Sequence, residues 1–276
     1  MERKLKPEAK YCVNSKLSFL DIVRAYKVGS TITGKVIDYN VDNEILVVDL
    51  GNGHQGILPW EEVCIYDFTY AIVSEVEKIP RQILVILYKT VRVKVIEINE
   101  GNIVLSRKKN MLEAVEKISS SGETIFKGVV VGKYKDGVFF DIAEGITAFC
   151  HITQYSKTFI ENIGAWLSLG EEELVELTQI NNVNNYRYQC SRKIAGSSAN
   201  DYKKYKEGQI IMVKVSKPVY NKDKLTGYFV EVSPNVSGIA DVLDERHTFR
   251  FGDEVIAVIK SINHKEKKMK LKIIVA

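Results

Sequence analysis

The chain has 276 residues, of which 45% are hydrophobic and 27% are charged, and its formal net charge is +4. This composition is typical of a globular protein with one to three domains, and it excludes a disordered chain. No run of 18 apolar residues occurs, and the first six residues, Met-Glu-Arg-Lys-Leu-Lys, lack the apolar stretch of a secretory signal. We therefore expect a cytoplasmic protein without a membrane span.

The sequence carries no motif that points to catalysis, a cofactor or a metal. None of the patterns GxxxxGK[ST], GxGxxG, HExxH and GxSxG occurs, and the four histidines lie far apart. The cysteines form no CxxC pair and lack histidines at zinc-ligand spacing; they are Cys12, Cys64, Cys150 and Cys190. We expect buried free thiols, no metal, no cofactor, no catalytic residues and no enzymatic activity.

Residues 1–27 are expected to form a basic arm followed by a short helix. Residues 1–30 hold seven basic and three acidic side chains, a net charge of +4. Ser18 and Asp21 have the spacing of a capping box, although Asp replaces the usual Glu or Gln. We expect the helix to pack under the domain that follows, through an apolar face made of Phe19, Ile22, Val23 and Tyr26.

The rest of the chain contains one pattern three times, in residues 28–109, 122–195 and 207–276. Each unit has five short segments rich in Val, Ile, Phe and Tyr, separated by Gly, Asn and Asp. In the first unit the segments are 31–36, 45–50, 56–59, 91–98 and 103–108. Five strands in 70 to 80 residues, roughly, favour a closed barrel, because an open sheet would leave apolar edges unpaired. Periodicity alone is also compatible with a flat β-sandwich.

The connecting segments also differ from one another. Residues 110–121 continue a helical pattern that starts near residue 107, whereas residues 196–206 are expected to form a flexible linker. A long insertion in the first unit contains Trp60 and several tyrosines, for which protein docking or a small local core are the two interpretations. Within it, the run 83–87 predicts a buried strand.

The order of motifs resembles the S1 RNA-binding domain, the family named after ribosomal protein S1. The resemblance rests on Gly137-Val-Phe-Phe-Asp141, on Ala148-Phe-Cys-His-Ile152, on Gly252-Asp253 before a fourth strand, and on Leu105-Ser-Arg-Lys108. It implies an all-β protein of three tandem five-stranded OB-fold barrels with short connecting helices. It also implies binding of single-stranded RNA, such as mRNA, in translation.

The resemblance and the need for exposed rings beside basic groups select candidate RNA-binding residues. In the second unit they are Tyr134, Phe139, His151 and Arg187, and in the third they are Tyr220, Tyr228, Phe229, Lys268 and Lys270. Strand alternation puts Phe139 and Phe140 on opposite faces, so one of them must be core. The alternative interpretations are that Phe139 is a core residue, that His151 is an ordinary surface histidine, and that the lysines form the solvated face of an edge strand.

Charge separates the three units. Residues 31–110 and 111–205 each carry a net charge of −2, whereas residues 206–276 carry +4. The resemblance therefore implies that the first two units dock onto the small ribosomal subunit and that the third grips RNA, in a monomer whose barrels act together on flexible linkers. The alternative is an adaptor whose barrels bind a ribosomal or regulatory protein with little RNA contact.

Overall fold

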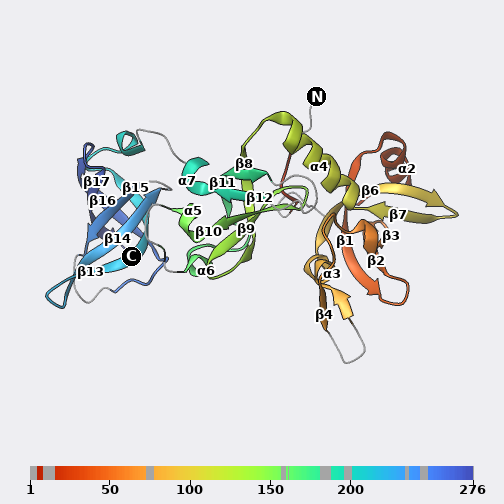
Figure 1. Ribbon diagram of the computed structural model, residues 1–276, viewed down its shortest axis with the longest axis horizontal. Coiled ribbons are helices and arrows are strands. Elements are labelled where there is room, and N and C mark those ends of the chain that lie inside the picture. Colours follow the sequence, from red (N-terminus) through yellow and green to blue (C-terminus); the bar gives the residue numbers. More distant parts are fainter. Residues whose placement is uncertain are drawn as a thin grey trace. The chain divides into compact units, whose positions relative to one another are not determined.

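The computed structural model describes residues 5–8, 16–72, 78–156, 160, 162–180, 188–195, 201–233, 236–242 and 248–275. These residues are mostly in strands, and the strands close into three five-stranded barrels (Figure 1). The predicted all-β class and the three OB-type barrels are thus confirmed. None of the described helices is long and apolar enough to cross a membrane.

The chain divides into two compact units, which are not the three repeated units of the sequence and which we describe separately. The first contains Met1–Glu123 together with Asp141–Thr147 and Ile180–Arg187, and the second contains Thr124–Phe140, Ala148–Gln179 and Tyr188–Ala276. The first barrel lies in the first unit, and the third barrel lies in the second unit. The strands of the second barrel belong mostly to the second unit, except for Asp141–Thr147, which holds a turn and the strand ends beside it, and Ile180.

The first barrel has the strand order β1-β2-β3-β7-β6, in which β3 and β7 run parallel and the other described pairs run antiparallel. Alternate residues point inward, as in the fully buried Leu46, Val48 and Leu50 of one strand. Its strands are β1 (Thr31–Asn40), β2 (Ile45–Gly51), β3 (His54–Pro59), β6 (Thr90–Asn99) and β7 (Asn102–Ser106).

Two helices cover this barrel. Helix α2 (Phe19–Val28) starts at Ser18 with a complete capping box to Asp21, as predicted, and buries Ile22. The predicted packing face is only partly correct, because Phe19 is 44% exposed and Tyr26 is 42% exposed. Helix α4 (Lys108–Ser121) includes the predicted helical segment and buries Met111, Ala114 and Ile118.

The insertion between β3 and β6 forms a small local core. It contains η1 (Trp60–Glu62), β4 (Tyr70–Ile72), β5 (Lys78–Pro80) and α3 (Arg81–Ile86). The strand predicted at residues 83–87 is wrong, because Ile83 and Ile86 are buried three residues apart on one side of a helical turn. Trp60 is also buried, which favours the local core for that residue.

The second barrel has the strand order β10-β12-β11-β8-β9, closed by β9 against β10. Its strands are β8 (Ile125–Lys133), β9 (Gly137–Ala143), β10 (Ile146–His151), β11 (Glu172–Ile180) and β12 (Tyr188–Ser191). Two one-turn helices follow strand ends, α5 (Ile152–Tyr155) after β10 and α7 (Arg192–Ala195) after β12, and a third, α6 (Ile163–Trp166), lies between α5 and β11. The core includes the fully buried Val138 and Phe140.

The third barrel repeats this order as β13-β14-β15-β17-β16. Its strands are β13 (Ile210–Asn221), β14 (Lys224–Ser233), β15 (Val236–Asp241), β16 (Glu254–Asn263) and β17 (Lys268–Val275). The helical turn η2 (Asp201–Lys204) precedes it, and Tyr202 of this turn packs in the barrel core with its hydroxyl donating to Ser237 O (2.9 Å). Residues 196–200 of the expected linker lie outside the described residues.

Candidate nucleic-acid interface

Four aromatic rings form a continuous strip on the outer face of the second barrel. Ring centroids are 5.6 Å apart for Tyr134 and Phe139, 5.0 Å for Phe139 and Phe149, and 6.4 Å for Phe149 and His151. Phe140 is fully buried, so strand alternation turns its neighbour Phe139 outward. Tyr134 is 61% exposed at one end of the strip. His151 at the other end is exposed, whereas Phe139 and Phe149 between them are half-buried. Aromatic rings in a row are the surface on which unpaired bases stack.

A glycine makes room for the central ring of this strip. A Cβ atom on Gly137 would lie 2.3 Å from Cζ of Phe149, so the Phe149 ring lies over the bare backbone of β9. Gly132 is different, because a Cβ there would lie 3.7 Å from Phe139, an ordinary contact distance. Of these two glycines, only Gly137 is required by the packing of the strip.

His151 ends the strip with its ring held in one orientation. Its Nδ1 accepts the backbone N–H of Thr153 (3.3 Å) at the start of α5 and lies 2.8 Å from the Thr153 hydroxyl. In the neutral ring this makes Nδ1 the acceptor and puts the proton on Nε2. The Nε2–H of an exposed imidazole can donate to a base or to a ribose hydroxyl.

In the third barrel the equivalent positions combine one ring with two lysines. Strand register aligns Lys217 of β13, Phe229 of β14, Ile239 of β15 and Lys270 of β17 in one row across the barrel surface. The Nζ atom of Lys217 lies 5.0 Å from the centroid of the Phe229 ring. This row combines one aromatic ring with a cation at each end, the groups that meet a base and its phosphates.

The first barrel has neither rings nor cations in the same row. Register there aligns Asp38 of β1, Val47 of β2, Ile57 of β3 and Val104 of β7. Val47 and Ile57 are half-buried aliphatic side chains where the second barrel has Phe139 and Phe149. This row can bury apolar area against a partner, but it cannot stack bases.

The structure brings together three of the four residues predicted in the second barrel, namely Tyr134, Phe139 and His151. Arg187 lies outside the described residues. Sequence reasoning missed Phe149, although it lies two residues before His151 on the same strand, and the period of two would have placed both on one face.

The residues predicted in the third barrel lie at different places in the barrel. Phe229 and Lys270 lie in the row, and Tyr220 is 61% exposed near the end of β13. Lys268 is exposed at the start of β17, where it pairs with Glu266 (2.9 Å). Tyr228 is a correction: its ring is 2% exposed in the barrel core, because strand alternation turns it opposite to Phe229.

Comparison with known proteins places the second barrel in a family. Residues 122–225 match the model described as the S1 RNA binding domain. The matched residues cover the second barrel and the start of the third. The aromatic strip of the second barrel lies within the matched residues.

Relatives of the chain match over part of their length. Small ribosomal subunit protein bS1 of Chlamydia trachomatis is 27% identical over 203 residues, which cover 66% of this chain and 34% of that protein. The bS1 protein of Streptococcus pneumoniae is 26% identical over 159 residues, covering 56% of this chain and 36% of that protein. The polyribonucleotide nucleotidyltransferase of Chlamydia caviae is 33% identical over 101 residues, covering 33% of this chain and 14% of that enzyme.

Among solved structures, a multidomain protein with nucleic acid binding domains from Streptococcus pneumoniae is similar to this chain. The alignment covers 89% of this chain and 73% of that chain, with 16% sequence identity and a TM-score of 0.32. The curated relatives are longer proteins, and the chain spans only 14% to 36% of their lengths.

Proposed function

We propose that this chain binds single-stranded RNA in translation, without enzymatic activity, and that the second and third barrels make the RNA contacts. The observation that carries the proposal is the strip from Tyr134 through Phe139 and Phe149 to His151, on the barrel that matches the S1 family. The bS1 relatives support the assignment to translation, because they are ribosomal proteins by name.

The two barrels contribute different parts of the binding energy. Stacking on the rings of the second barrel contributes about 1–3 kcal/mol per base and needs no sequence code. In the third barrel, Lys217 beside Phe229 and Lys270 at the other end of the row, next to Ile239, meet phosphates on either side of a stacked base. RNA binding by the third barrel therefore depends more strongly on salt than binding by the second.

The first barrel favours a second function, which is docking to a protein. Its row of Val47, Ile57 and Val104 has no ring, and the Asp38 carboxylate at its end repels phosphate. The small ribosomal subunit is the partner that the bS1 relatives suggest. In this scheme the first barrel docks and the other two bind mRNA.

The test is fluorescence anisotropy of a labelled oligouridylate with the whole chain and with Phe149→Leu. Leucine keeps the apolar contact with Phe139 but removes the stacking face, so the fold is retained. We expect affinity to fall by about tenfold, equivalent to about 1.4 kcal/mol.

The matched control is Ile57→Ala, at the register-equivalent position of the first barrel, and it is expected to leave RNA affinity unchanged. Equal affinities of Phe149→Leu and the unmodified chain would show that the strip is not the RNA site. Loss of affinity in Ile57→Ala alone would assign RNA binding to the first barrel.

A further inference from the structure

A short motif at the end of the fifth strand occurs in two barrels and takes no part in the RNA surface. Ser106-Arg107-Lys108 follows β7, and Ser191-Arg192-Lys193 follows β12. Both arginines are 7% exposed. A buried guanidinium needs partners, since an unpaired buried charge is strongly destabilising.

The two motifs hold equivalent corners of their own barrels. Lys108 Nζ donates to the carbonyl oxygen of Glu61 (3.2 Å), and Lys193 Nζ donates to that of Thr153. Glu61 and Thr153 occupy the same place, in the helical turn that follows the third strand. The serines contact the next residue of each turn, in the pairs Ser106–Glu62 and Ser191–Gln154.

In the second unit, the arginine reaches from the second barrel to the third. Arg192 Nη1 lies 2.7 Å from Oε1 of Glu231, which is 5% exposed on β14, and its Nη2 lies 2.9 Å from Oε1 of Glu173 on β11. The guanidinium also stacks 4.3 Å from the centroid of the Tyr155 ring. Burial raises the pKa of Tyr155, so its hydroxyl stays protonated and donates to Glu173 (2.9 Å).

Apolar packing supports the same junction. The ring of Trp166, from α6 of the second barrel, is 2% exposed and lies 5.0 Å from the ring of Phe251 in the third barrel. Lys214 Nζ, from β13, lies 5.3 Å from the Trp166 centroid. A buried ion pair and a buried aromatic contact therefore connect the same two barrels.

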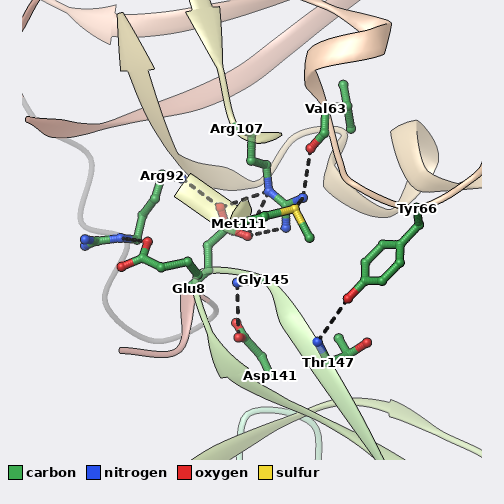
Figure 2. A network of polar contacts seen from close by, with 10 residues as sticks. Glu8, Val63, Tyr66, Arg92, Arg107, Met111, Asp141, Gly145 and Thr147 are labelled. Atoms are coloured by element: carbon green, nitrogen blue, oxygen red, sulfur yellow. Dashed lines mark hydrogen bonds and ion pairs between the residues drawn. The ribbon is translucent and has the colours of Figure 1, made fainter. Parts of the chain in front are cut away.

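The first unit contains the equivalent arginine in a similar setting (Figure 2). Arg107 Nη2 pairs with Oε2 of Glu8 (2.6 Å), and its Nη1 donates to Val63 O (3.0 Å). The charge of Asp141, on β9, also acts on this guanidinium. At the following turn, a Cβ on Gly145 would lie 2.0 Å from Arg107 Nη2, so the turn lies directly against the arginine.

The acidic partners occupy equivalent strand positions. Asp141 is the fifth residue of the segment that begins at Gly137, and Glu231 is the fifth residue of the segment that begins at Gly227. In the second compact unit, Arg192 after the fifth strand of one barrel thus pairs with the acid on the second strand of the next barrel. In the third barrel, Ile273 stands at the position of the arginine.

We infer that Ser191-Arg192-Lys193 at the end of the fifth strand is a coupling element between the second and third barrels, and that Arg192 is the positioning residue that makes these two barrels move as one body. The consequence of this coupling for RNA binding rests on the proposed function. An RNA strand that contacts both barrels then binds two surfaces held at a fixed spacing. It avoids the conformational entropy cost of ordering two independently moving barrels.

The test compares the whole chain with Glu231→Gln, which keeps the shape of the side chain and its contact with the Ser156 hydroxyl (3.0 Å) but removes the charge that pairs with Arg192. The control is Asp49→Asn, at the equivalent second-strand position of the first barrel. The first readout is ¹⁵N relaxation of backbone amides. We expect equal rotational correlation times for the second and third barrels in the unmodified chain and in the control, and shorter, separate values in Glu231→Gln.

The second readout is affinity for an RNA long enough to span both barrels and for one that fills a single barrel. Glu231→Gln should weaken binding of the long RNA about tenfold and leave binding of the short RNA unchanged. Separate correlation times in the unmodified chain would overturn the coupling whether or not RNA binds. If neither RNA binds the unmodified chain, the proposed function fails, and relaxation still decides the coupling.

Discussion

Phe149 shows how one residue of the candidate site depends on the absence of a side chain elsewhere. Its ring lies across Gly137 on the neighbouring strand, at a place where any Cβ atom would overlap it. The ring is thereby held between Phe139 and His151 in the strip. Rings that are positioned before RNA arrives lose little conformational entropy on binding.

Gly137→Ala is predicted to lower both stability and RNA affinity. The new methyl group would lie 2.3 Å from the Phe149 ring and 2.8 Å from the carbonyl oxygen of Cys150, and the second of these atoms is backbone that cannot easily move. We expect a loss of about 1–3 kcal/mol in the free energy of unfolding, measured in denaturant. Gly132→Ala is the control and should change neither property. Equal stability of the two variants would contradict this account of the strip.

At the scale of elements, the strands were predictable because their composition and alternation are local properties of the sequence. The capping box of α2 was predictable for the same reason, since Ser18 and Asp21 satisfy each other within one turn. The run 83–87 was not, because five apolar residues fit a strand or a helical turn equally well. Burial of Ile83 and Ile86 in the folded protein selects the helical turn.

The candidate site was only partly predictable. Alternation separated Phe139 from Phe140, but the sequence does not state which of Tyr228 and Phe229 faces the core. The rows across each barrel depend on register between strands distant in sequence, as in the pairing of Ile239 with Lys270. The partners of Arg107 and Arg192 come from segments distant in the sequence, so burial and pairing of these charges had no local signal.

The β9–β10 turn gives a prediction at the scale of an element. Gly145 has a φ of 83°, and a Cβ there would meet the Arg107 guanidinium (Figure 2). Gly145→Ala should therefore cost about 3 kcal/mol or more, since it combines backbone strain with displacement of a buried ion pair. Gly122→Ala has similar backbone strain in open space and should cost only about 1–2 kcal/mol in the same chemical denaturation experiment. A smaller loss for Gly145→Ala than for Gly122→Ala would contradict the tight packing against Arg107.

At the scale of the whole molecule, one barrel plan carries three different surfaces. The equivalent row is aliphatic with an acidic end in the first barrel, aromatic in the second, and aromatic with two lysines in the third. Net charge follows the same order, from −2 in residues 31–110 to +4 in residues 206–276. A docking barrel followed by two RNA-binding barrels is the division of labour that these surfaces favour.

The most direct test of this account is the salt dependence of RNA binding, measured by anisotropy for the unmodified chain and for the double variant Lys217→Met/Lys270→Met. We predict binding at low salt that weakens steeply as salt rises. The slope of log affinity against log salt should become shallower in the variant, by about 0.7 for each phosphate that a lysine no longer neutralises. Absence of binding at low salt, or a slope that is the same in both proteins, would contradict the account.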